Sequence, residues 1–239
     1  MSTEIKNKHS VPSSSLPVVD RSILKEYAAF QERVKAAQMK KEEEMIQFER
    51  KVFPVQQPLL KQRAAITSEI PGFWNAVIQG NDDAREYAKD DDTTDVLDTL
   101  LDISIDIPST EPPRFKITFT FGPNDYFTDT TLSLDFMDEP FNPTLINRST
   151  IHWKEGKNIL ENLAKFNKSN EADDPELLPF HTIFELWGEE SADVVGLVDV
   201  LKQIAINPLI DYESFFDDSD SSDMDEESSS EDSSDSSDE

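Results

Sequence analysis

The highest density of ionisable and phosphorylatable side chains lies at the C-terminal end of the sequence, in DDSDSSDMDEESSSEDSSDSSDE, residues 217–239. This stretch holds twelve carboxylates, ten serines, one methionine and no Lys or Arg. Like charges repel, and almost no apolar surface is present to offset the entropy of ordering, so we expect an extended, solvated tail. Such a segment acts as a polyanion that attracts cations.

Some serines of this tail are candidates for phosphorylation because an acidic residue follows three positions later: Ser222, Ser228, Ser229 and Ser236. An acid-directed kinase that modified them would add about 1.5 to 2 negative charges per phosphate. The alternative is that the serines only separate the carboxylates.

Residues that commonly carry catalysis are sparse. The three histidines are scattered, and the last two adjoin aromatic residues against which we expect them to pack: His9, His152 and His181. The chain has no cysteine, and EGKNI (155–159) lacks the upstream glycine and the following Ser or Thr of a phosphate-binding loop. The run Asp90–Asp92 has no calcium-loop spacing around it, so we interpret it as a solvated loop. We predict no enzyme, with no catalytic residue, cofactor or metal site.

The charge balance points to a basic partner. The chain carries 50 Asp and Glu against 22 Lys and Arg, a net charge of -28, and carboxylates outnumber bases before the tail as well. A field of this sign repels nucleic acid and anionic lipid and attracts Lys/Arg-rich proteins. We therefore expect no direct binding to nucleic acid or membranes. For the tail alone, a role in solubility is the alternative.

Nothing in the sequence indicates secretion or membrane insertion. Without cysteine, a disulfide framework is excluded. No basic segment followed by an apolar one opens the chain, and no apolar run approaches the roughly twenty residues of a membrane span. We expect the protein in the cytosol or nucleus.

A long helix is predicted over 20–68. Asp20 is a good N-cap, and no Gly or Pro follows for more than thirty residues. Pro54 and Pro58 should then interrupt the helix, because each lacks a backbone donor and crowds the preceding turn. Apolar residues recur along it at spacings of four and three, with one phase shift, and we predict them as the dimerisation face: Ile23, Tyr27, Phe30, Val34, Ala37, Met45, Phe48, Val52, Leu59 and Leu60.

The length of this helix favours a homodimer. Close to 50 residues would span about 75 Å, which is longer than a domain of this size can cover. We therefore expect a second copy of the helix to pack against it, antiparallel or crossed. One long core helix of a single domain is the alternative.

The middle of the chain predicts an antiparallel sheet. Apolar and polar residues alternate in 101–107, 115–121 and 132–136, with turn residues at 122–129, and a fourth strand is expected at 149–153. Leu101 should share the buried face of the first strand. Helices are expected at 73–78 and from 82 to about 100, and helical cover for the sheet from 156–166, 174–188 and 192–206. The fold class is therefore α+β.

Several stretches, in this order, resemble the nucleosome assembly protein (NAP/SET) family of histone chaperones. They are QQPLLKQRAAITSEIPGFW (56–74), RFKITFTFGPNDYFTDTTLSLDF (114–136), STIHWKEGKNI (149–159), LKQIAINPLIDYESFF (201–216) and the terminal acidic tract. The short length resembles the compact SET-like branch. The resemblance implies a homodimer joined by the long helices, in which α/β earmuff-like domains form a concave acidic underside that binds core histones.

The resulting domain organisation has four parts. We predict a disordered leader over 1–19, the long dimerisation helix over 20–68 with a break near Pro54 and Pro58, an α/β earmuff domain with a four-stranded sheet over 69–212, and a disordered acidic tail over 213–239.

Histone-binding residues are predicted among the acidic groups. On the folded part the candidates are Asp173, Asp174, Glu176, Glu185, Glu189, Glu190, Asp193 and Asp199; in the tail they are Asp217, Asp218, Asp220, Asp223, Asp225, Glu226 and Glu227. An ordinary solvated surface is the alternative for each residue alone.

The resemblance implies a chaperone that shields core histones from non-specific DNA contacts and promotes nucleosome assembly or disassembly. It would be nuclear, with exchange with the cytoplasm left open, and a chromatin-modifying enzyme or an import factor could be a further partner. Alternatives are a factor that evicts or excludes one histone variant, a coiled-coil adaptor without enzymatic activity, and a DNA-mimicking inhibitor of another basic protein.

Overall fold

The computed structural model describes residues 21–173, 180–188 and 195–222. The chain divides into two units, 1–42 and 43–239, which are considered separately. The elements are α1 (Arg21–Thr67), α2 (Phe73–Gly80), α3 (Asp82–Arg85), α4 (Asp91–Leu97), β1 (Leu100–Asp106), β2 (Arg114–Phe121), β3 (Thr131–Met137), β4 (Thr144–Arg148), α5 (Ile159–Asp173), the 3-10 helix η1 (Ile183–Trp187), α6 (Val195–Ile206) and α7 (Leu209–Ser222). None of the described helices is both long and apolar enough to span a membrane.

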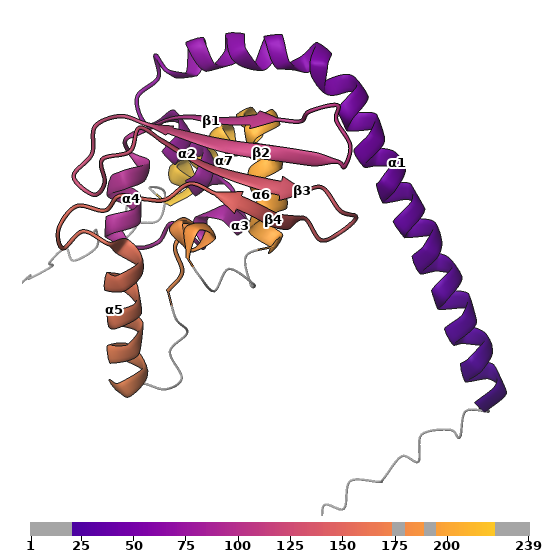
Figure 1. Ribbon diagram of the computed structural model, residues 1–239. Helices are drawn as coiled ribbons and strands as arrows, with labels where there is room; N and C mark the ends of the chain where they lie inside the picture. The colour runs from indigo at the N-terminus through magenta and orange to yellow at the C-terminus, as the bar shows by residue number, and fades with distance from the viewer. Residues whose placement is uncertain (1–20, 174–179, 189–194, 223–239) are drawn as a thin grey trace, which may run out of the picture. The chain divides into compact units, whose positions relative to one another are not determined.

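Within the described residues, the strands form one antiparallel sheet in the order β1-β2-β3-β4. Ile117 of β2 lies opposite Ile105 on one side and Leu134 on the other. Side chains of one face are buried, and α2, α6 and α7 lie behind the sheet in Figure 1. The predicted α+β class, with a long N-terminal helix and a four-stranded sheet, is confirmed.

Two details of the sheet differ from the prediction. Leu101 is 45% exposed while Leu100 is buried, because the register shifts between Leu100 and Asp102. Such an irregularity turns the preceding side chains to the opposite face. The fourth strand is Thr144–Arg148 rather than 149–153, where only Trp153 forms an isolated bridge, to Phe127.

The helix expected from residue 82 to about 100 is in fact two short ones. The side chain of Asn81 accepts hydrogen bonds from Asp83 and Ala84 and begins α3, and Asp90 accepts one from Thr93 and begins α4. Each of these polar side chains satisfies backbone donors that a helix start leaves unpaired. A second cap at residue 90 therefore divides the predicted helix.

The helix is not broken near Pro54 and Pro58, since α1 continues through both, but the ribbon of α1 bends in its C-terminal part in Figure 1. The prolines are four residues apart, so their rings and the hydrogen bonds that they remove lie on one side of the helix. Both side chains are exposed, and the remaining backbone bonds preserve the helix.

From residue 43 onward, α1 has a face that packs on the domain, formed by Ile46, Arg50 and Phe53. Arg50 is 4% exposed and donates from Nη1 to Glu111 Oε1 at 2.7 Å and from Nη2 to the Thr110 carbonyl at 2.5 Å. These bonds attach the loop between β1 and β2 to the helix.

Helix α7 starts within the folded domain and extends beyond the predicted boundary at residue 212. Tyr212 stacks on Phe73 of α2, with ring centroids 4.7 Å apart. Residues 213–222, assigned to the disordered tail, are helical instead. The aromatic contact with α2 holds the first turn of α7 on the domain.

Gly80 permits the close approach of α2 and α7. A Cβ at Gly80 would lie 1.9 Å from the Asp211 carbonyl oxygen and 2.9 Å from the Phe215 nitrogen. Because both atoms belong to the backbone, a side chain there would force the helices apart. We expect Gly80→Ala to lower the free energy of unfolding by about 1 to 3 kcal/mol, measured by chemical denaturation.

Gly196 in α6 is the matched control, since a Cβ there meets no atom within 4 Å. Gly196→Ala should leave stability unchanged or raise it by about 0.5 to 1 kcal/mol. Equal destabilisation by both substitutions would contradict the steric argument.

Candidate functional site

The most acidic described stretch is residues 82–98, here called the acidic segment. It contains eight carboxylates and two bases: Asp82, Asp83, Glu86, Asp90, Asp91, Asp92, Asp95 and Asp98, with Arg85 and Lys89. Arg85 pairs with Asp82 at 2.8 Å, and Lys89 with Glu86 at 2.5 Å. Both bases are thus engaged within the segment, which retains an excess of negative charge. None of these residues was among the binding residues predicted from the sequence, although the density of Asp was the available signal.

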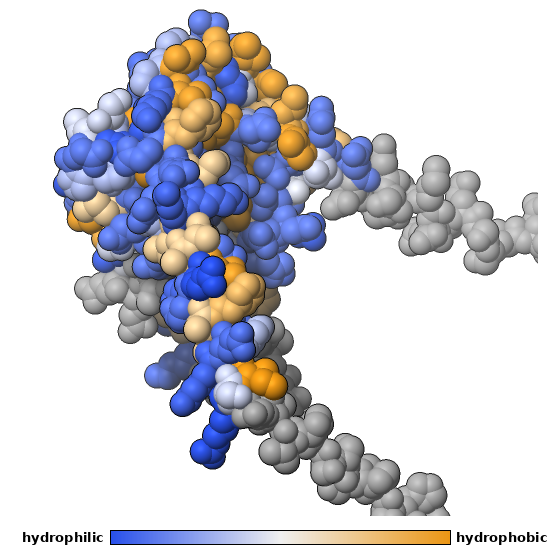
Figure 2. All heavy atoms as spheres, turned by 90° about the vertical axis from the view of Figure 1, so that its right-hand side faces the viewer, coloured by the Kyte–Doolittle hydropathy of each residue, from blue (hydrophilic) through white to orange (hydrophobic). Residues whose placement is uncertain are grey.

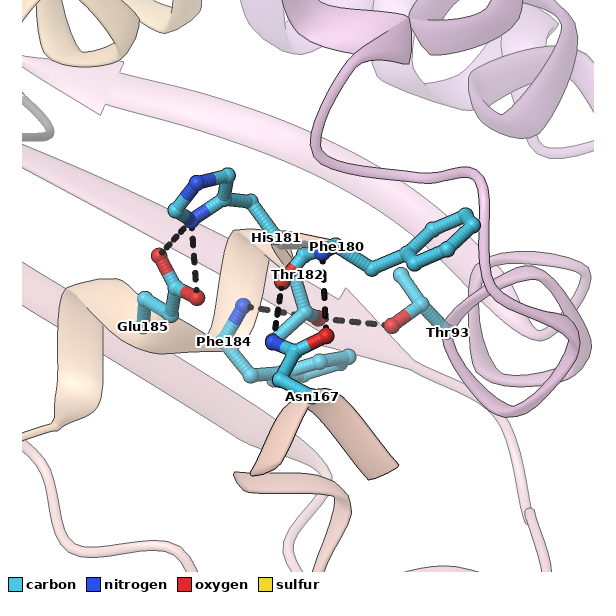
Figure 3. A network of polar contacts seen from close by, with 7 residues as sticks. All are labelled: Thr93, Asn167, Phe180, His181, Thr182, Phe184 and Glu185. Atoms are coloured by element: carbon cyan, nitrogen blue, oxygen red, sulfur yellow. Dashed lines mark hydrogen bonds and ion pairs between the residues drawn. The ribbon is translucent and has the colours of Figure 1, made fainter. Parts of the chain in front are cut away.

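The acidic segment is attached to residues 180–185, as Figure 3 shows. The Thr93 and Thr182 hydroxyls lie 2.6 Å apart in the interior, and the Ile183 amide donates to the Tyr87 carbonyl at 2.8 Å. From α5, the Asn167 side chain both donates to and accepts from the backbone of Phe180, at 2.8 and 3.0 Å. The segment, α5 and the start of η1 therefore form one connected region.

Two hollows border this region, and the Phe180 side chain lines both. One, of ≈ 640 Å³, lies beside Glu86, Tyr87 and His181. The other, of ≈ 460 Å³, lies beside Asp91 and Phe166. Both combine apolar walls with carboxylates of the acidic segment.

A second group of carboxylates surrounds Lys202 of α6. Its Nζ lies 2.8 Å from Glu49 Oε2 and 3.4 Å from Asp138 Oδ2, and 4.9 Å from the centroid of the Phe115 ring. Lys202 thereby links α1, the end of β3 and α6 by one cation.

Two carboxyl groups near Lys202, those of Asp138 and Asp199, have raised pKa values. Burial raises the pKa of Asp138, although Lys202 acts in the opposite direction. Burial also raises the pKa of Asp199, and the negative charge of Glu49 adds to this. Burial alone would lower the pKa of Lys202, but Asp138 and Glu49 outweigh it and the pKa is raised.

The predicted binding residues do not converge on one place. Glu185 lies in η1 and contacts His181, Asp199 belongs to the group around Lys202, and Asp217 is exposed on α7. The backbones of Asp173, Asp218, Asp220 and Ser222 are helical, but their side chains are not described. The other candidates lie outside the described residues: Asp174, Glu176, Glu189, Glu190, Asp193, Asp223, Asp225, Glu226, Glu227, Ser228, Ser229 and Ser236.

His152 and His181 do not simply pack on their aromatic neighbours as expected. His152 Nδ1 lies 2.9 Å from Asp129 Oδ1, and His181 Nδ1 lies 3.1 Å from Glu185 Oε2. Burial alone would raise the pKa of Asp129, but the hydrogen bonds and charge of His152 outweigh it and the pKa is lowered. In the described part of the chain, no group of three or more His, Cys, Asp or Glu is arranged to hold a metal ion.

Most of the predicted dimerisation face is exposed on α1: Ile23, Tyr27, Phe30, Val34, Ala37, Met45, Phe48 and Leu59. Val52 is half-buried, and Leu60 packs against the core of the domain. Val55 and Ile66, which were not predicted, are exposed on the same helix. Figure 2 shows from one side that the protein surface is mostly hydrophilic, with separate hydrophobic patches.

Known proteins with a similar sequence or fold are nucleosome assembly proteins. The family model described as nucleosome assembly protein (NAP) matches residues 67–177, which contain the sheet and the acidic segment. The crystal structure of nucleosome assembly protein S from Plasmodium falciparum superposes with a TM-score of 0.51 at 22% identity, covering 79% of this chain and 99% of that one. The fold is therefore that of nucleosome assembly proteins.

Sequence relatives agree with this fold. NAP1-related protein 2 of Arabidopsis thaliana is 24% identical over 235 residues, 94% of this chain and 89% of its own. NAP1-related protein 1 of Oryza sativa subsp. indica is 26% identical over 155 residues, which are 64% of this chain and 60% of the rice protein. The matched region thus spans less than two thirds of the rice relative. Residues 67–177 therefore resemble nucleosome assembly proteins in sequence, and the chain shares their fold.

We expect Lys202→Met to lower the free energy of unfolding by about 3 kcal/mol at neutral pH, because it leaves the buried Asp138 without its cation. The folded-state pKa of Asp138 is already raised, so its ionisation opposes folding, and loss of Lys202 raises that pKa further. The deficit should therefore shrink as the pH falls and Asp138 takes up a proton. Urea denaturation at about pH 7 and about pH 5 measures both effects.

Lys165→Met serves as the control, because Lys165 and Glu161 are exposed and 3.9 Å apart. This substitution should change stability by less than about 0.5 kcal/mol at either pH. A Lys202→Met deficit that stayed constant between the two pH values would argue against the role of Asp138.

Proposed function

We propose that this chain is a histone chaperone that binds core histones through acidic surfaces of its α/β domain and through its acidic C-terminal residues. The observation that carries the proposal is the acidic segment within the region matched by the nucleosome assembly protein family. The bases of the segment are paired with its own acids, so the surplus carboxylates remain for a cationic partner.

The mechanism is competition for positive charge. Histone Lys and Arg side chains bind DNA phosphates non-specifically and release counterions. Protein carboxylates that occupy the same side chains weaken these contacts and leave the correctly ordered ones to form. A C-terminal polyanion tethered to the domain would raise the local concentration of acceptors.

Such competition operates in both directions, so it is compatible with deposition and with removal of histones. Eviction of one histone variant is a narrower form of the same activity. A coiled-coil adaptor would use only α1, and a DNA mimic would prefer other basic proteins. The proposed place of action is the nucleus.

We further propose that the protein is a homodimer joined through α1. Ile23, Tyr27 and Phe30 are each more than half exposed, and an apolar row of this kind on a helix is normally covered. A second copy supplies the same row and can cover it symmetrically.

Phe30→Glu should convert the dimer to a monomer at micromolar concentration, because it places a carboxylate in the apolar contact. Sedimentation velocity measures the result. Ala36→Glu adds the same charge to the opposite side of the helix, where Ala36 is exposed, and should leave the dimer intact. Dimerisation of both variants would place the interface elsewhere.

Histone binding should be measured with purified core histone complexes at about 0.15 and about 0.3 M salt, where exposed charges are strongly screened. A variant that ends at Ser222 keeps α7 and removes the acidic residues after it. We expect this truncated protein to bind more weakly, but still measurably at the lower salt. If the full-length protein also fails to bind core histones at the lower salt concentration, the chaperone proposal is contradicted.

The contribution of the acidic segment is tested by the double variant Asp83→Asn and Asp91→Asn, which removes two exposed carboxylates outside its ion pairs. We expect a threefold to tenfold weaker histone affinity, that is about 0.7 to 1.4 kcal/mol. The control Glu26→Gln with Glu32→Gln removes equal charge from α1 and should have a smaller effect. Equal effects would mean that net charge alone determines binding.

A further inference from the structure

The smaller hollow is a groove between the start of α4 and one side of α5, here called the Phe166–Phe180 groove. Leu163, Phe166 and Phe180 form its apolar wall, and Asp90, Asp91 and Asp92 line the other side. Phe166 is 51% exposed and meets Phe180 at a tilt of 66°, with ring centroids 5.8 Å apart. The groove has a volume of ≈ 460 Å³, which accommodates a few side chains.

Both walls are held in place before any ligand binds. Asn167 of α5 clamps the backbone of Phe180, and Thr182 contacts Thr93 of α4, so one short segment is bonded to both helices (Figure 3). The Phe180 ring points away from His181 in this view. A groove that needs no ordering on binding loses less entropy when it is occupied.

The three carboxylates of the groove differ in whether they already accept hydrogen bonds from the protein. Asp90 caps α4 through Thr93, and Asp92 accepts a hydrogen bond from the Tyr126 hydroxyl at 2.9 Å. Asp91 is exposed, and no hydrogen bond or ion pair is seen for it among the described residues. Lys89 also lines the groove, but its ammonium group lies 2.5 Å from Glu86. A cationic ligand therefore meets an accessible carboxylate beside an aromatic pair.

We propose that the Phe166–Phe180 groove binds a short protein segment in which a Lys or Arg lies next to a large aliphatic or aromatic side chain. The apolar side chain covers Phe166 and Leu163, and the cation pairs with Asp91, close to the aromatic faces that also attract cations. The acidic C-terminal residues of this chain do not fit the groove, because its three aspartates would repel a segment of twelve carboxylates without a Lys or Arg.

This inference rests on the proposed function only in that the partner is basic. It adds a requirement for an apolar side chain beside the cation, which charge attraction alone does not impose. It predicts sequence preference among basic segments. A polyanionic surface alone would bind any segment of equal charge with similar affinity.

Fluorescence anisotropy of three labelled peptides with the full-length protein tests the proposal. The first peptide contains Lys and Arg beside Leu and Phe, the second has Ser in place of Leu and Phe, and the third has Gln in place of Lys and Arg. We expect the first to bind about tenfold more tightly than either of the others at about 0.15 M salt. Equal binding of the first and second peptides would overturn the proposal.

Matched variants locate the site. Phe166→Ser should weaken the first peptide about five- to tenfold and Asp91→Asn about two- to fivefold, whereas Ile210→Ser and Glu213→Gln, on exposed positions of α7, should change its affinity less than twofold. Circular dichroism melts verify that each variant is folded. Unchanged affinity for both groove variants would exclude the groove as the site.

The same proteins, assayed with core histone complexes, separate this inference from the proposed function. Histone binding by the full-length protein with no effect of either groove variant on the peptides would leave the chaperone proposal standing and remove the groove. Groove-dependent peptide binding without histone binding would support the groove and contradict the chaperone proposal.

Discussion

The fold depends on covering the single apolar face of its sheet. Strands that alternate apolar and polar residues leave a row such as Ile103, Ile117 and Leu134 that water would otherwise contact. Helices α2 and α6 pack on the sheet and α7 packs on α2, and the burial of so much apolar surface is the main stabilising contribution. The helices of this layer also pack closely on one another, and Gly80 lies where α2 meets the backbone of α7.

In so acidic a chain, several buried or half-buried cations hold elements together. Arg50 attaches α1 to a loop, Arg63 donates to the carbonyls of Ala205 and Ile206 at the end of α6, and Lys202 joins three elements. Acidic residues instead occupy the first turns of α3 and α4, where backbone N–H groups and the helix dipole favour negative charge. The acidic segment is therefore compatible with the fold and still retains charge for a partner.

Local patterns in the sequence predicted much of this architecture. Period-two alternation predicted the buried faces of β2 and β3, and helix propensity predicted α1 almost to its ends, because both signals depend on neighbouring residues. Composition predicted an acidic surface. It did not predict which carboxylates gather on the domain, since the acidic segment is joined to Thr182 and Asn167 only through contacts between distant parts of the chain.

The sequence by itself thus determined the α+β class, the long amphipathic helix and the excess of negative charge. Only the tertiary structure decided which row of α1 packs on the domain, through Ile46 and Phe53, and which remains exposed. It also decided that the first turn of α7 is held on α2, through the stacking of Tyr212 on Phe73, and that Phe166 and Phe180 lie beside three aspartates. The reason is physical: periodicity is set by neighbours along the chain, whereas these arrangements depend on which surfaces remain to be buried once the sheet and its helices have packed.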